Sequence, residues 1–273
     1  MIETILVATD GSEAAASAEK YAVSLAARLR CRVLGLSVVE DRVLQGFRDN
    51  ALGVPLPPLE PLEAFLKARA DAACRRLSET ARAQGIEAAC ETAQGRADDV
   101  IAERSQRADL LVLGRDGEHA ATRTALIGST ADATLRKTAR PSLVVPPGAR
   151  LEGPLVLAFD GSPGSKLAAE LAVELGRRLE EPVHVFVDSK DKGRALARFN
   201  EARRLLGSLA VQARETSSTL GRPDVKIVEA ARDVGASMIL MGAYGRSRIT
   251  EYFIGSNSAA VVRTSPVAVL LAR

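Results

Sequence analysis

Tryptophan is absent from the sequence, and aromatic residues make up only 3% of its 273 positions. A buried core must therefore be built from valine, leucine, isoleucine and alanine. No apolar run approaches the roughly 18 residues of a membrane span, and the first ten residues carry no signal-peptide pattern. The formal net charge is only +3, and basic residues are not interleaved with aromatic ones. We expect a globular protein that binds neither nucleic acid nor membranes.

Cysteine and histidine are also scarce. Cys31, Cys74 and Cys90 are odd in number and lack metal-ligand spacing, so we expect reduced thiols and a cytoplasmic location. His184 lies inside an apolar run and is expected in the core or on a sheet face. His119 is either an ordinary loop residue or a phosphate contact. No metal site and no catalytic residue are expected.

One pattern occurs twice in the sequence. Residues 4–10 read TILVATD and residues 154–160 read PLVLAFD. Each apolar run ends in aspartate, continues with Gly-Ser and enters an amphipathic helix. A short valine- and leucine-rich run is typical of a buried strand. The repetition predicts two related domains.

Each half alternates strands with helices in the same order. The near-continuous apolar strands predict a parallel sheet with helices on both faces, and right-handed crossovers make the sheet doubly wound. We predict an α/β fold with two domains, residues 1–148 and 149–273, joined by a junction rich in proline and glycine. The expected strands are residues 4–10, 31–40, 86–92, 109–114 and 141–146, then 154–160, 182–189, 210–216, 237–242 and 266–271.

The first half is longer than the second. The two Asp-Gly-Ser motifs lie 150 residues apart, whereas Gly114 and Gly242 lie 128 residues apart, so the first half holds 22 more residues. They fall in the proline-rich stretch 41–61. A loop this long is usually functional or disordered. It either covers a ligand or bridges the domains, or it is a surface excursion.

Three elements should meet in each half, because ligands of open parallel sheets bind beyond the carboxyl ends of the strands. They are the end of the first strand, the end of the second strand, and a glycine-bearing loop that opens a helix. Glycines allow close approach of a ligand, and a helix amino end attracts anions. The aspartate could accept ribose hydroxyls or hold Mg²⁺. The candidates are Asp10, Val39, Gly114, Gly117, Gly128, Ser129 and Thr130 in the first half, and Asp160, Val187, Gly242, Gly245, Gly255, Ser256 and Asn257 in the second.

The spacing Gly-x₂-Gly-x₉-Gly-Ser after a strand, with aspartate ending the first strand, resembles the universal stress protein family in its tandem form. The resemblance covers both halves and implies Rossmann-like domains that pair through their last strands as an internal pseudo-dimer. It also implies ATP as the ligand, with or without Mg²⁺. The phosphates would lie on the glycine loop, the nucleoside on the aspartate, and adenine on the backbone after the second strand. A homodimer of two chains is compatible with this arrangement.

The two halves differ in how well they fit that pattern. The first half has ten residues, rather than nine, between its second and third glycines. Asp116 and Glu118 would repel phosphates there unless Arg115, Arg123 or a metal compensates. The second half has the regular spacing, with Arg246 and Arg248 within reach, although its short loop after the second strand leaves adenine less covered. We therefore favour the second site.

Three functions are compatible with these observations. The first is an ATP-binding regulatory or stress-response module with slow or no hydrolysis. The second is a nucleotide-free scaffold or partner-binding protein, in which the glycines serve only loop turns. The third is an ATPase or phosphotransferase, whose turnover would depend on Asp160 or Asp10. The sequence lacks Gly-x₄-Gly-Lys-Ser/Thr and a Gly-x-Gly-x-x-Gly after its first strand.

Overall fold

The computed structural model describes residues 1–42, 58–116, 128–211, 215–216, 222–243 and 255–273, and the structural statements below concern these residues. The first half contains β1 (Thr4–Thr9), α1 (Glu13–Leu29), β2 (Arg32–Glu40), α3 (Glu60–Ala83), β3 (Ala88–Gly95), α4 (Ala97–Ser105), β4 (Leu110–Gly114), α5 (Ser129–Lys137) and β5 (Ser142–Val145). The second contains β6 (Leu155–Ala158), α6 (Pro163–Leu179), β7 (Val183–Asp188), α7 (Lys192–Leu206), β8 (Ala210–Val211), β9 (Glu215–Thr216), α8 (Pro223–Asp233), β10 (Met238–Gly242), α9 (Ser256–Thr264) and β11 (Ala268–Ala272).

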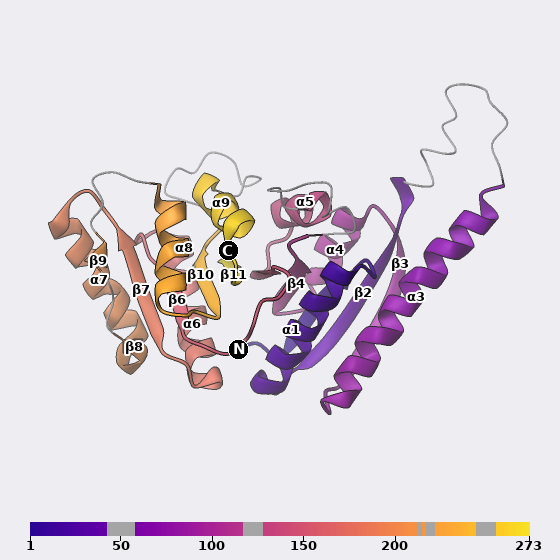
Figure 1. Ribbon diagram of the computed structural model, residues 1–273, viewed down its shortest axis with the longest axis horizontal. Helices are drawn as coiled ribbons and strands as arrows, with labels where there is room; N and C mark the ends of the chain where they lie inside the picture. The colour runs from indigo at the N-terminus through magenta and orange to yellow at the C-terminus, as the bar shows by residue number, and fades with distance from the viewer. Residues whose placement is uncertain (43–57, 117–127, 212–214, 217–221, 244–254) are drawn as a thin grey trace, which may run out of the picture.

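One sheet runs through both halves (Figure 1). Its order is β3-β2-β1-β4-β5-β11-β10-β6-β7-β8, with β9 also pairing with β7. The pairs within each half are parallel, and β5 and β11 pair antiparallel at the centre. The predicted pair of doubly wound α/β domains is confirmed, and they join through their last strands.

The third strand of the second half is described only at its two ends. We predicted one strand over 210–216, and the structure describes β8 and β9 within it, both paired with β7, while residues 212–214 lie outside the described residues. In the first half the corresponding strand, β3, pairs with β2 from Val33 to Glu40.

Helices cover both faces of the sheet and enclose two apolar layers. One layer contains residues of α1, α3, α6 and α7, and the other contains residues of α4, α5, α8 and α9. Each layer includes residues from both halves, so the core is continuous across the junction. As the composition predicts, the core is mainly leucine, valine, isoleucine and alanine, with Phe159 among its largest buried side chains. Fully burying one such leucine contributes about 1.5–3 kcal/mol.

Two arginines at equivalent positions exchange hydrogen bonds across the centre of the molecule. The Arg28 guanidinium, on α1, donates to the carbonyl of Leu179 at the end of α6. The Arg178 guanidinium, on α6, donates to the carbonyl of Leu29 at the end of α1. Cations are favourable at helix carboxyl ends, where carbonyls lack helical partners. Each half therefore caps a helix of the other.

A second pair of arginines crosses the junction on the opposite face. Arg115, after β4, donates to the carbonyl of Ser265 at 2.9 Å, just beyond α9. Arg273, after β11, donates to the carbonyl of Thr138 at 2.9 Å, just beyond α5. The last strands and these caps together hold the halves in one orientation.

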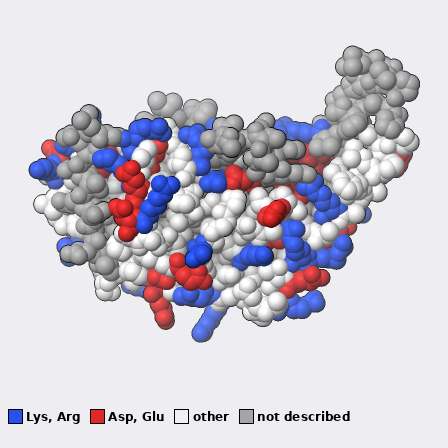
Figure 2. All heavy atoms as spheres, in the orientation of Figure 1, with Lys and Arg blue, Asp and Glu red and all other residues white. Residues whose placement is uncertain are grey.

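Charges of both signs are interspersed over the face of the molecule seen in Figure 2. No large patch of a single sign covers the described part of that face. Long-range steering of a strongly charged macromolecule needs such a patch. A candidate site must therefore be sought in local geometry.

Candidate functional site

The Asp-Gly-Ser motif builds the turn from the first strand to the first helix in each half. Oδ1 of Asp10 accepts the Ser12 amide at 2.9 Å, and Oδ1 of Asp160 accepts the Ser162 amide at 2.9 Å. The serine hydroxyl of each motif then caps the following helix. These bonds place both aspartates beyond the carboxyl ends of β1 and β6. The serine caps were predictable from the sequence, whereas the role of the aspartates in the turn was not assigned from it.

The first glycines of the two predicted loops end strands. A Cβ atom at Gly242 would lie 2.9 Å from the carbonyl carbon of Gly164, so this glycine lets the start of α6 approach β10. At Gly114 the nearest atom would be the Asp116 carbonyl oxygen, at 3.3 Å. Helix packing therefore accounts for glycine at 242. Gly117 and Gly245 lie outside the described residues, as do His119, Arg123, Arg246 and Arg248.

The third glycines stand directly before the helices, as predicted. Gly128 precedes α5 and Gly255 precedes α9, and neither helix start has a side-chain cap among the described residues. The Gly255 amide donates to the carbonyl of Ala243 at 2.9 Å, which brings the start of α9 to the end of β10. The first turn of α9 then contains Ser256 and Asn257, and that of α5 contains Ser129 and Thr130. Amide groups at such a helix start suit an anion.

A pocket of about 280 Å³ opens in the second half beside these elements. Asp160, Gly242 and Asn257, all predicted, line it. Its walls also include Phe186 from β7 and Ile227 from α8. The pocket therefore spans the ends of β10, β6 and β7 and reaches the start of α9. It joins an apolar interior to a helix amino end.

Two charged residues of this pocket were missed by sequence analysis. Asp188 ends β7, and Arg198 comes from α7. A guanidinium nitrogen of Arg198 donates to the main-chain carbonyl of Asp188 at 3.3 Å. The Asp188 side-chain oxygen Oδ1 is buried and has no hydrogen-bond partner in the part of the chain that the structure describes. The signal that could have found Asp188 is a charged residue at the end of an otherwise apolar strand.

Val39 and Val187, chosen as the second-strand ends, are not equivalent positions. Ala8 pairs with Leu36 and Ala158 with Phe186, so the counterpart of Val39 is two residues beyond Val187. Both valine side chains are buried in apolar clusters. Only their backbone is available to a ligand. Because successive side chains of a strand alternate between its faces, Phe186 and Asp188 line the pocket, whereas the Val187 side chain does not.

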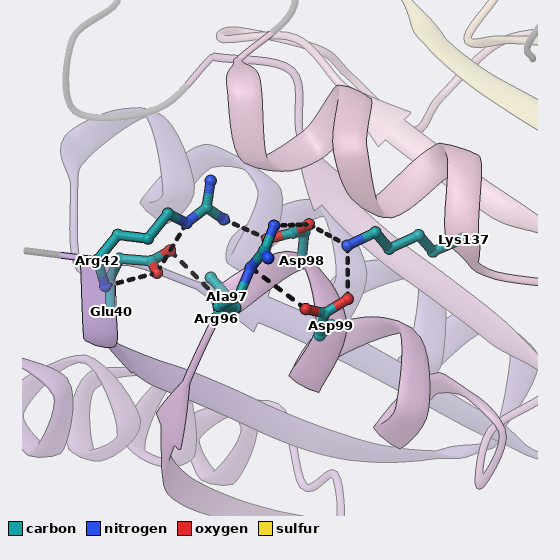
Figure 3. Close-up of polar contacts among 7 residues, drawn as sticks. All are labelled: Glu40, Arg42, Arg96, Ala97, Asp98, Asp99 and Lys137. Carbon is teal, nitrogen blue, oxygen red and sulfur yellow. Dashed lines mark hydrogen bonds and ion pairs between the residues drawn. The ribbon is translucent and has the colours of Figure 1, made fainter. Parts of the chain in front are cut away.

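The same corner of the first half is bridged by its own ion pairs (Figure 3). Glu40, at the end of β2, accepts the Ala97 amide at 3.2 Å. Arg42 and Lys137 approach Asp98 from opposite sides and pair with its carboxylate. In the second half, Pro223 replaces Ala97 and has no amide hydrogen to donate. Its ring lines the pocket instead.

Asp98 is the centre of this network, and its side chain is only 3% exposed. Burial alone would raise the pKa of Asp98. The hydrogen bond from Lys137 and the charge of Arg42 outweigh burial and hold the pKa below its usual 3.8. The carboxylate is therefore ionised at neutral pH and ties β2, α4 and α5 together.

The repulsion expected from Asp116 is compensated within the protein. Arg115 pairs with the Asp116 carboxylate at 2.9 Å while it caps α9. His184, expected in the core or on a sheet face, lies half-buried in β7 and pairs in register with Val156 of β6. His184 is not among the residues that line the pocket, and His119 lies outside the described residues.

Comparison with known proteins agrees with this architecture. The sequence profile of the Universal stress protein family matches residues 1–146 and again residues 153–273. The chain belongs to the universal stress protein family. A universal stress protein of Synechocystis sp. is 25% identical over 288 residues, and the match covers 100% of each chain. One from Thermus aquaticus is 34% identical over 133 residues, which cover 44% of this chain and 97% of that protein.

A solved universal stress protein from Archaeoglobus fulgidus has the same fold along its length. It superimposes with a TM-score of 0.77 and 19% identity, covering 99% of this chain and 98% of the other. The tandem arrangement is therefore shared over the whole sheet. Within the described residues, no helix is long and apolar enough to cross a membrane.

The cysteines of this universal stress protein correct the expectation of reduced thiols. Cys74 on α3 and Cys90 on β3 form a disulfide, with their Cα atoms 5.4 Å apart. Cys31 is free and buried. Sequence spacing alone did not indicate this pairing, because the two cysteines meet only when α3 packs on the outer strand.

Proposed function

We propose that the second half of this universal stress protein binds ATP and that binding serves a regulatory or stress-response role. The observation that carries the proposal is the pocket across β10, β6 and β7, which ends at the start of α9. Three adjacent strand ends thus offer an anion site, a carboxylate and an apolar wall in one line. A nucleotide presents a polyphosphate, a ribose and a base in the same order.

The phosphates would lie at the start of α9. The amide groups of Ser256 and Asn257 belong to its first turn, and no side-chain cap among the described residues occupies them. The helix dipole favours negative charge there by about 0.3–1 kcal/mol at an exposed site. Mg²⁺ would be held mainly by the phosphates, with the Asp160 carboxylate as its nearest protein oxygen ligand.

The nucleoside would occupy the rest of the pocket. A carboxylate has several acceptor positions, so Asp160 can accept a ribose hydroxyl while it keeps the Ser162 amide. Phe186 and Ile227 provide an apolar surface for the flat faces of a base. The volume of about 280 Å³ is close to the lower end of small-molecule sites, which suits the nucleoside part of the ligand.

We expect the first half to bind ATP more weakly than the second half, or not at all. Its candidate residues, Asp10, Gly114, Gly128, Ser129 and Thr130, are arranged like those of the second half. Its outer corner, however, is bridged by the ion pairs of Asp98 with Arg42 and Lys137. A base would have to displace these pairs. We therefore expect one ATP per chain.

Calorimetric titration with ATP and Mg²⁺ tests this proposal with a matched pair of variants. Ile227 and Ile101 occupy equivalent positions on α8 and α4, and each is 5% exposed. Ile227→Trp should fill the second pocket and weaken binding at least tenfold, whereas Ile101→Trp should leave it unchanged. Circular dichroism melts show whether both variants fold. Two equal sites, or equal binding by both variants, would contradict the assignment.

The second candidate is a nucleotide-free scaffold. The observation that favours it is that packing alone accounts for Gly242 and hydrogen bonding for the Asp-Gly-Ser turns. Wild-type protein whose melting temperature does not move with ATP would support this alternative. The described residues place no general base beside the proposed phosphates, so the proposal includes slow or no hydrolysis. The cytoplasmic location stays a prediction.

A further inference from the structure

Asp188 lies at the far end of the pocket from the proposed phosphate site. The strands β10, β6 and β7 are neighbours in the sheet, and Asp188 ends the third of them. Neighbouring strands are about 4.8 Å apart, so roughly 10 Å separates the end of β10 from that of β7. A ribose and a base bridge about this distance. A nucleotide whose phosphates lie at α9 therefore brings its base to Asp188.

The carboxylate of Asp188 has an unused acceptor. Its Oδ1 atom is buried and has no hydrogen-bond partner, although the side chain lines the pocket. Such an atom loses hydration on folding without compensation, and native structures rarely leave it so. The main-chain carbonyl of the same residue already accepts from Arg198 at 3.3 Å. The side chain, rather than the backbone, thus offers the free acceptor.

The first half shows that the strand does not need this carboxylate. The register makes Val38 the counterpart of Asp188, and Val38 packs against the apolar layer on the same side of the sheet. An apolar residue therefore fits the same strand position. Asp188 therefore distinguishes the second half from the first at the position where the base of a bound nucleotide would lie.

We propose that Asp188 is a specificity-determining residue, whose Oδ1 accepts a hydrogen bond from the 6-amino group of adenine. This inference rests on the proposed function. An exocyclic amine is a good donor to an ionised carboxylate, and such charge-assisted hydrogen bonds are stronger than neutral ones. A buried acceptor left unpaired penalises any base that lacks the donor. Arg198 also lines this pocket and donates to the main-chain carbonyl of Asp188.

A ligand that differs only at this group provides the test. Purine riboside 5′-triphosphate carries hydrogen in place of the 6-amino group and keeps the ribose and phosphates of ATP. Calorimetry should show that the wild type prefers ATP over this analogue by roughly ten- to a hundredfold. Asp188→Val, which copies the first half, should bring the ratio close to one. Asp188→Asn keeps a carbonyl acceptor without the charge, so it should give an intermediate ratio.

The possible failures are distinguishable. If the wild type binds neither triphosphate, the proposed function is wrong and this inference falls with it. If it binds both equally, or if Asp188→Val keeps the wild-type ratio, Asp188 does not recognise the amine and only this inference is overturned. Tighter binding of GTP than of ATP would also overturn the adenine assignment. Circular dichroism melts of both variants ensure that folded protein is compared, and Asp188→Val, which removes the unpaired oxygen, should melt no lower than the wild type.

Discussion

Replacing Asp98 by alanine should lower the free energy of unfolding by about 2–4 kcal/mol. Its carboxylate is 3% exposed and pairs with Arg42 and Lys137, which come from either side of α4 (Figure 3). A hydrogen bond to a charged group contributes about 1.5–3 kcal/mol. The two cations are 48% and 34% exposed, so water partly screens them and the sum is reduced.

The second half provides the matched control for this substitution. Asp224 stands at the same position of α8 and is 5% exposed, but it pairs with Arg222, which is 71% exposed. Asp224→Ala should therefore cost about half as much, about 1–2 kcal/mol. Urea unfolding of the two variants and the wild type measures both losses. Equal losses, or a loss under about 1 kcal/mol for Asp98→Ala, would refute the reasoning.

The stabilisation by Asp98 should also depend on pH. The pKa of Asp98 in the folded protein lies below 3.8, because Lys137 and Arg42 outweigh the effect of burial. The unfolded chain therefore binds a proton at a higher pH than the folded one does. The stabilisation by the ionised Asp98 carboxylate is fully present above about pH 5 and is lost as the pH falls through the pKa of Asp98 in the folded protein. The stability difference between the wild type and Asp98→Ala should therefore be constant above about pH 5 and shrink as the pH falls below about 4.

Three further predictions concern other parts of the fold. In urea unfolding, Arg178→Ala should lower the free energy of unfolding by roughly 2 kcal/mol and Arg28→Ala by roughly 1 kcal/mol, because Arg178 also donates to the carbonyl of Ile2. Equal losses would contradict this prediction. Reducing the disulfide with dithiothreitol should cost about 3 kcal/mol, because it opens a loop between residues 16 apart, and the reductant should not affect Cys90→Ala. Burial raises the pKa of Cys31 to about 11. The stabilisation that comes from keeping the buried Cys31 thiol neutral is present below about pH 9 and is lost as the pH rises towards 11. Over this range the free energy of unfolding of Cys31→Ala should therefore fall by about 2–3 kcal/mol less than that of the wild type, as measured by thermal melts at each pH.

Much of the fold followed from the sequence because its causes are local. Apolar runs of strand length, amphipathic helices and the repeated Asp-Gly-Ser turn each depend on neighbouring residues. Their order alone then restricts the sheet to a doubly wound form. The pairing of β5 with β11 came from the resemblance to a family rather than from the residues themselves. At the outer edge of the second half, β8 and β9 both lie within the predicted strand 210–216, whose middle residues lie outside the described part of the chain.

The site was less predictable because its distinctive residues meet only in three dimensions. Asp98 and Lys137 are 39 residues apart and belong to different helices. Asp188 was not selected because the end of the second strand was assigned to its neighbour Val187, whose backbone was expected to contact adenine. Successive side chains of a strand point to opposite faces, so Asp188 lines the pocket whereas Val187 is buried in an apolar layer.

Duplication gave this chain two copies of one strand-end site, and the copies have changed in opposite directions. In the first copy, the Ala97 amide donates a hydrogen bond to Glu40, and Asp98 forms ion pairs with Arg42 and Lys137. In the second, Pro223 removes that amide and Asp188 adds an unpaired acceptor. Ion pairs stabilise the first corner at the expense of access, whereas an unsatisfied oxygen costs stability unless a ligand provides the donor. The asymmetry therefore supports the proposal that the second half, rather than the first, binds the ligand.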